Sequence, residues 1–394
     1  MIPGFLGFAN LGRITYFGHV RRILAARLAA TGIDTRIHLV RTSATASLPR
    51  RAGQLAEAVA ATARDDGPVH LIGHSSGGLD ARLFTAPGVM LPTSADVERA
   101  VARVRSVVTI ATPHHGTPLA SFFTTLRGQQ VLQLLSLLTI YMLHFGHVPL
   151  SGLLWMASRM VRLADLVASS ELINEVFGRL LGDFTAARRR SVRAMLRDVV
   201  DDQALMLQLT PEAMELFNAA VLPRPNVRYG AVVAQATPPS LGSTLAVGID
   251  PAAQVTHAVY GMLYRLAAQT PRDRSPRLAA EVTRALRHAY GTAPSTAAND
   301  GIVPTRSQAW GPVIHAAVAD HLDVLGHFGD AAHDPPHVDW LVTGSRFDRP
   351  GFEALWGDVT RFLATGDDAS EAVSAARPRG GARVDPDCHF RERT

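Results

Sequence analysis

A serine between glycines is the strongest chemical signal in the sequence. Gly73-His74-Ser75-Ser76-Gly77 follows the apolar stretch VHLI and precedes the helix-forming stretch LDARLF. A serine on a tight turn between a strand and a helix exposes its hydroxyl, and small neighbours leave room for the strained backbone. The start of the helix also places the amide of Ser76 where it can donate to a developing oxyanion. The pattern therefore predicts that Ser75 is a covalent nucleophile.

A serine nucleophile needs a base, and the base needs an acid that orients it. The acid candidate is Asp300, which lies in a polar turn ahead of an apolar stretch. The base candidate is His321, which follows the strand-like stretch 311–319, and His327 is the alternative base. Both candidates come after Ser75 in the chain order serine, acid, histidine. The remaining histidines nearby lie inside the strand pattern or in a proline-rich loop and are weaker candidates: His315, His333 and His337.

A second oxyanion donor is expected from a glycine-rich turn near the start of the chain. Residues 3–7 read Pro-Gly-Phe-Leu-Gly. We assign the donor to the amide of Phe5, with the amide of Leu6 as the alternative. An ordinary glycine-rich turn would explain the same residues without a catalytic role.

Short apolar runs alternate with helical patterns along the chain. In the helix expected over 49–64, Arg50 and Arg51 should face solvent while Leu55 and Val59 face the core. Thr210-Pro211 predicts a helix start, with a hydroxyl cap and proline at the first helical position. Strands that alternate with helices predict βαβ units and a parallel sheet. We expect a further helix over 15–31 and strands over 33–40, 69–72, 104–112 and 227–233.

The middle of the chain has a different composition. Residues 128–158 contain no Asp, Glu, Lys or Arg, but Gly146, Pro149 and Gly152 interrupt the apolar run. A membrane-spanning helix needs about 20 apolar residues in succession. Three interpretations stay open for this stretch: a pair of buried helices, a lid whose apolar face meets lipid, or insertion into a membrane.

Composition and charge exclude several classes of protein. Of the 394 residues, 47% are hydrophobic and 19% are charged, which excludes a mostly disordered chain. The net charge is +5, but all 39 basic residues are arginine and no basic stripe carries interleaved aromatic residues, so nucleic-acid binding is not expected. The single Cys388 excludes intrachain disulfides and cysteine-ligated zinc. The histidine spacing does not match a catalytic metal motif.

Taken together, these motifs resemble those of the α/β-hydrolases of the bacterial lipase type. The resemblance implies an α/β-hydrolase fold, with a mostly parallel sheet, flanking helices and a helical lid insertion. It places the hydrolase core at 1–120 and 205–365, the lid at 121–204 and a disordered tail at 366–394. The matching stretches are PGFLGF at 3–8, GHSSGG at 73–78, ATPHHGTPLA at 111–120, NDGIVP at 299–304 and HLD at 321–323.

The resemblance implies hydrolysis of carboxylic esters, with acylglycerols as the leading substrate class. Ser75 would attack the ester, His321 would move the proton, Asp300 would orient the imidazole, and the amides of Phe5 and Ser76 would bind the oxyanion. The stretch 128–158 would then make transient contact with a membrane or lipid interface. The alternatives are an acyltransferase or thioesterase with the same triad, and a non-catalytic lipid-binding protein.

Three departures from the family pattern lead to further expectations. Pro3 stands where the family has histidine, so we expect one hydrogen bond to the oxyanion loop to be missing. Asp323 matches a calcium ligand of some relatives, but His327 occupies a second ligand position, so no calcium or other cofactor is expected. Only Met1 and Ile2 precede the oxyanion loop, and no secretory signal is visible, so we hypothesise a start farther upstream. Localisation stays open: cytoplasmic by default, or secreted or membrane-associated with an upstream segment.

Overall fold

The computed structural model describes the chain except for residues 6–15, 63–66, 146–177, 272, 340 and 376–394. Four parallel strands form a sheet in the order β1-β2-β3-β4. Ile2 forms a parallel bridge with Gly73 on the other side of β1. The order follows the chain, as successive βαβ units require. The strands are β1 (Val69–His74), β2 (Val104–Ile110), β3 (Arg228–Ala234) and β4 (Val313–Ala317).

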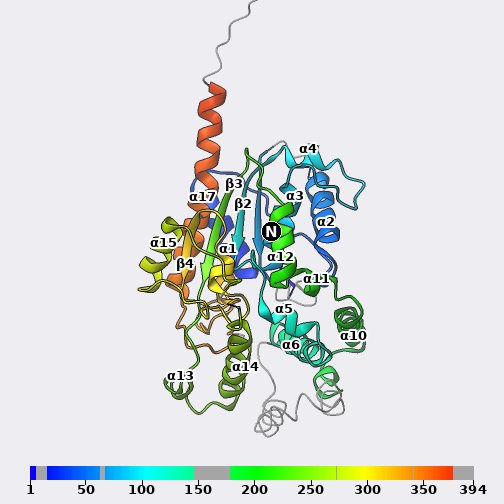
Figure 1. Ribbon diagram of the computed structural model, residues 1–394, viewed down its shortest axis with the longest axis vertical. Coiled ribbons are helices and arrows are strands. Elements are labelled where there is room, and N and C mark those ends of the chain that lie inside the picture. The colour runs from blue at the N-terminus through cyan, green and yellow to red at the C-terminus, as the bar shows by residue number, and fades with distance from the viewer. Residues whose placement is uncertain (6–15, 63–66, 146–177, 272, 340, 376–394) are drawn as a thin grey trace, which may run out of the picture.

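Helices cover both faces of this sheet. Figure 1 shows α1 (Gly18–Ala30) and α17 (Arg349–Ala375) on one side of the strands and α2 (Leu48–Ala61) and α3 (Ser76–Thr85) on the other. Strands buried on both faces are typical of parallel sheets, and β2 is buried along almost its whole length. The other described helices are α4 (Val97–Val101), α12 (Pro211–Ala220), α15 (Ala280–Tyr290), α16 (Thr305–Gln308) and the short 3-10 helix η1 (Asp323–Leu325).

A third group of helices lies beyond the carboxyl ends of the strands. Figure 1 shows α5 (Pro118–Phe123), α6 (Leu126–Phe145) and α14 (Pro251–Ala267) below the sheet. The described residues within 121–204 are largely helical, and the second half of the apolar stretch lies outside the described residues. No helix among the described residues is long and apolar enough to cross a membrane. The remaining helices are α10 (Ala186–Asp201), α11 (Ala204–Gln208) and α13 (Leu241–Ala246).

Two expectations about the elements are wrong. Residues 33–40 form no strand. Two hydrogen bonds join the segment to the first residue of the chain: the Met1 amino group donates to the carbonyl of His38, and the amide of Val40 donates to the carbonyl of Met1. The disordered tail expected at 366–394 does not begin at 366, since α17 continues to Ala375, and residues 376–394 lie outside the described residues. The helix start at Thr210 is confirmed, with its hydroxyl accepting from the amide of Ala213.

Candidate active site

Ser75 occupies the sharp turn between β1 and α3. Its φ of 55° and ψ of −131° lie outside the ordinary regions for a residue with a side chain. The turn holds because its neighbours are glycines. A Cβ added at Gly73 would lie 2.4 Å from the carbonyl oxygen of Gly77, so a side chain at Gly73 would clash with the backbone. The strand–turn–helix arrangement predicted from the sequence is therefore present.

His321 and Asp300 lie next to one another at the carboxyl end of the sheet. The Nδ1 atom of His321 lies 2.8 Å from Oδ2 of Asp300, and both side chains are buried. Oδ2 also accepts from the amide side chain of Gln308, and Oδ1 accepts from the backbone amides of Ile302 and Val303. These four donors fix the carboxylate, which in turn directs the imidazole so that Nε2 is left for a reaction partner.

His327, the alternative base, is placed elsewhere. It is buried, and burial lowers the pKa of its imidazole to about 4. Its backbone amide donates to the carbonyl of Leu322. The hydrogen bond between Asp300 and His321 therefore favours His321 over His327 as the base.

Ser75 and His321 line one partly enclosed pocket, whose cavity volume is about 60 Å³. The walls are mainly apolar and come from both the core and the insertion. Such a pocket suits an apolar group that ends in one polar, reactive centre. The residues that line it are Phe5, Tyr16, Ser75, Pro113, Thr117, Leu119, Ala120, Phe123, Leu132, Leu135, Met206, Leu209, Ile302, Val303 and His321.

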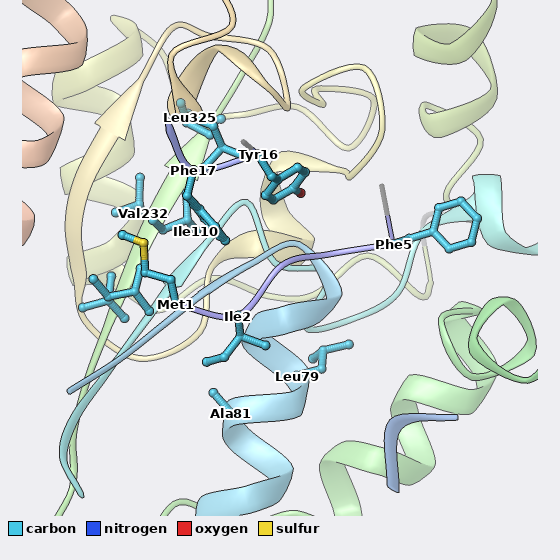
Figure 2. Packing of buried hydrophobic residues seen from close by; sticks show 14 of the residues in the cluster. Met1, Ile2, Phe5, Tyr16, Phe17, Leu79, Ala81, Ile110, Val232 and Leu325 are labelled. Carbon is cyan, nitrogen blue, oxygen red and sulfur yellow. The ribbon is translucent and has the colours of Figure 1, made fainter. Parts of the chain in front are cut away.

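The segment with the expected oxyanion donor lies directly against the nucleophile. A Cβ added at Gly4 would lie 2.5 Å from Cβ of Ser75 and 3.1 Å from its Oγ, so only glycine allows this approach. Figure 2 shows Ile2 over the helix that carries Leu79, with Phe5 farther along the same segment. Ser76 is the first residue of α3 and is buried. Leu6 lies outside the described residues.

The expectation that Arg51 faces solvent is wrong. Its side chain is 0% exposed and forms an ion pair with Asp80 of α3, with Nη2 lying 2.7 Å from Oδ2. The same Nη2 donates to the carbonyl of Pro3 at 2.8 Å. Arg51 therefore supplies a hydrogen bond to the loop in which Pro3 stands. Helical periodicity could not reveal this, because a buried charge depends on a partner from another element.

His74 also contacts His321, through a hydrogen bond to its backbone that the sequence did not indicate. Nε2 of His74 lies 2.8 Å from the carbonyl oxygen of His321, and a carbonyl only accepts, so Nε2 donates. Nδ1 of His74 then accepts from the hydroxyl of Tyr16 at 2.6 Å. Burial, followed by the nearby His321, lowers the pKa of His74 well below its usual value. His74 was visible in the serine motif, but its bond to His321 spans 247 positions.

An acidic cluster follows the catalytic histidine candidate. Asp320, Asp323 and Asp339 offer carboxylate oxygens within 4.8 Å of one another. Oδ2 of Asp320 and Oδ1 of Asp339 are buried and have no hydrogen-bond partner among the described residues. Buried carboxylate oxygens without donors suit a hard cation such as Ca²⁺. The donor set therefore fits calcium better than Asp323 and His327 suggested, because it uses two aspartates that the sequence did not single out.

Comparisons with solved structures find the same fold in bacterial enzymes. Lipase 1 from Pelosinus fermentans matches with a TM-score of 0.50 and 15% identity, over 91% of this chain and 97% of that chain. EstA from Clostridium botulinum matches with a TM-score of 0.49 and 18% identity, over 92% of this chain and 86% of that chain. Staphylococcus hyicus lipase matches with a TM-score of 0.48 and 17% identity, over 94% of this chain and 95% of that chain.

No protein-family model and no curated protein matches the sequence. At identities this low, a likeness to solved structures is evidence for the fold alone. The match to lipase 1 provides that evidence. The parallel sheet with helices on both faces and the serine turn after β1 agree with that match. The chain therefore has the same overall fold as lipase 1, a parallel α/β sheet with helices on both faces.

Proposed function

We propose that this protein hydrolyses carboxylic esters with apolar acyl groups. One observation carries the proposal: Ser75 on its strained turn and the bonded pair of His321 and Asp300 meet at a single apolar pocket. A protein that only binds lipid has no need of this combination. The likeness to lipase 1 in fold supports the proposal without specifying the substrate.

In the first half of the reaction, Oγ of Ser75 attacks the carbonyl carbon of the ester. Nε2 of His321 takes the hydroxyl proton, and Asp300 stabilises the imidazolium through the bond to Nδ1. The amides of Phe5 and Ser76 donate to the oxyanion of the tetrahedral intermediate. The intermediate collapses when the bond to the alcohol oxygen breaks, and His321 returns its proton to the leaving alcohol.

In the second half, water replaces the alcohol. His321 takes a proton from water as its oxygen attacks the acyl carbon, and the resulting intermediate collapses to the free acid. The proton returns to Oγ of Ser75, which restores the enzyme. The same base therefore acts twice, and the cycle consumes only the ester and one water molecule.

The pocket supports a substrate with a substantial acyl chain. Leu132 and Leu135 of α6 belong to the insertion and are buried where they line the pocket with Met206 and Leu209. Burial of each methylene of an acyl chain contributes about 0.8 kcal/mol. We propose that the insertion serves as a lid over the acyl chain and makes the contact with a lipid interface.

We also propose that Asp320, Asp323 and Asp339 hold a structural Ca²⁺. The ion would offset the negative charge of three carboxylates, two of them on buried residues, next to the loop that carries His321. Its role there would be structural, since the proposed reaction passes through the triad and the oxyanion donors.

Hydrolysis of p-nitrophenyl esters from acetate to palmitate tests the proposed activity. We expect measurable hydrolysis by the natural chain, with a preference for longer acyl groups, and a decrease in kcat of at least about 10⁴-fold in Ser75→Ala. Ser121→Ala is the matched control, because Ser121 is exposed on α5 and the chemical change is the same. Its kcat should stay within about twofold of the natural chain.

Two outcomes would contradict parts of the proposal. If Ser75→Ala keeps the activity of the natural chain, Ser75 is not the nucleophile. If added glycerol diverts most of the acyl group into new ester instead of free acid, the protein is an acyltransferase with the same triad. A preference for acetate would contradict the proposed acyl role of the lid.

A further inference from the structure

Three histidines that do not belong to the proposed catalytic triad lie close together in space. One comes from the start of the chain and two come from a segment more than 300 residues later. His19 lies in the first turn of α1, and His333 and His337 lie in the segment after η1. Each offers a ring nitrogen, and the three nitrogens lie within 4.8 Å of one another. The ring centres of His19 and His337 are 3.8 Å apart, and those of His333 and His337 are 4.7 Å apart.

The backbone fixes which nitrogens are available in two of these rings. Nδ1 of His337 lies 2.7 Å from the carbonyl oxygen of Gly326, and Nδ1 of His333 lies 2.8 Å from that of Pro335. A carbonyl only accepts, so Nδ1 carries the hydrogen in each ring and Nε2 keeps its lone pair. A histidine that donates one nitrogen to a carbonyl and offers the other is typical of metal ligands.

His19 contributes a nitrogen without a partner. Its Nδ1 is buried and makes no hydrogen bond with the described residues. A buried polar atom left unpaired costs free energy, which a bound ion would recover. The ring of His337 is stacked against the rings of His19 and Phe328, and its backbone forms a bridge with Asp330.

We propose that His19, His333 and His337 bind a divalent transition-metal ion, with Zn²⁺ the best match to three imidazoles. Zn²⁺ accepts nitrogen ligands in a four-coordinate site, and water would complete the set. Since His19 and His337 are stacked with an angle of 20° between their planes, their rings must turn so that both lone pairs face the ion. The bound ion would join the start of α1 to the segment that follows the His321 loop.

Cobalt binding to the full chain, produced without a histidine tag, tests this site. Co²⁺ replaces Zn²⁺ in nitrogen-ligated sites and gives a visible absorption band when four-coordinate. The titration is made in excess Ca²⁺, which occupies the carboxylate cluster of Asp320, Asp323 and Asp339 and leaves nitrogen sites to cobalt. We expect one Co²⁺ per chain, with the band displaced by one equivalent of Zn²⁺.

Variants show which residues hold the ion. His333→Asn removes a ligand that is only partly buried, and we expect Co²⁺ affinity to decrease about 100-fold or more. His288→Asn is the matched control, because His288 is exposed on α15, and its affinity should stay within about twofold of the natural chain. If circular dichroism shows that His333→Asn is unfolded, His19→Asn takes its place, since His19 is also only partly buried.

A thermal measurement gives an independent readout. Zn²⁺ should raise the melting temperature of the natural chain and of His288→Asn, but not that of His333→Asn. Absence of the cobalt band in the natural chain would overturn the proposal. An unchanged band in His333→Asn and His19→Asn would do so as well, because the ion would then lie elsewhere.

Discussion

His321, His333 and His337 all follow β4 in the chain, and they differ in what their Nδ1 atoms contact. His321 has a carboxylate partner, Asp300, at 2.8 Å. His333 and His337 have backbone carbonyl partners at 2.8 and 2.7 Å. Both arrangements fix the tautomer, because both partners accept a hydrogen bond from Nδ1.

The difference is in charge. A carboxylate stabilises the imidazolium that forms when Nε2 takes a proton, whereas a carbonyl supplies no full negative charge. His321 can therefore act as a base, and the other group is better suited to hold a metal ion. A third case is His114, whose Nδ1 lies 3.1 Å from the guanidinium of Arg82. Because this partner is a cation, protonation is less favourable at His114 than in the other two arrangements.

Among the proposed variants, replacement of the Asp300 carboxylate should have the largest effect on kcat. In Asp300→Asn, we expect kcat for ester hydrolysis to decrease about 10⁴-fold, because the amide can donate to Nδ1 and favour the wrong tautomer. The measurement is steady-state hydrolysis of a p-nitrophenyl ester. Asp34→Asn, at an exposed position, is the control and should keep its kcat. A variant at Asp300 with more than a tenth of the natural kcat would show that the carboxylate is dispensable.

Loss of the bond behind His321 should have an intermediate effect. In His74→Asn, the carbonyl of His321 loses its donor and the ring can shift, so we expect kcat to decrease about 10–100-fold with KM nearly unchanged. Tyr16→Phe removes only the hydroxyl bonded to His74 and should have a smaller effect on kcat. An equal rise in KM in both variants would indicate loss of the pocket's shape instead of misplacement of His321.

The smallest expected effect is that of His114 on the pH dependence of the free energy of unfolding. Burial, followed by the charge of Arg82, lowers the pKa of this fully buried imidazole well below 6.5. Below pH 6.5 the unfolded chain binds a proton at His114 that the folded chain does not, so the free energy of unfolding decreases as the pH falls. We expect His114→Gln to reduce that loss by on the order of 1 kcal/mol at pH 5.

Urea denaturation at pH 7 and pH 5 measures this change. His288→Gln is the control, since His288 is exposed on α15 and its substitution should leave the pH dependence unaltered. The same pH dependence in His114→Gln and the natural chain would mean that His114 does not contribute to it.

Much of the candidate site could be predicted from the sequence because its signals are local. The serine turn needs only glycines on either side of Ser75, and the turn of Asp300 needs only the neighbouring amides that fix its carboxylate. Chain order predicted a histidine after Asp300, and the position of His321 directly after the strand-like stretch 311–319 favoured it over His327. The strand expected over 33–40 failed for the opposite reason, because alternating residues form a strand only where a partner offers a continuous ladder of hydrogen bonds.

The sequence by itself determined the parallel α/β class and the residue types at the proposed nucleophile, base and acid. Tertiary structure decided which buried groups meet: Arg51 with Asp80 and the carbonyl of Pro3, and His74 with Tyr16 and His321. Tertiary structure also decided the environment of each histidine. The reason is that a motif fixes local backbone geometry, whereas the charge a side chain can carry depends on partners that only the packing of distant elements brings within a few ångströms.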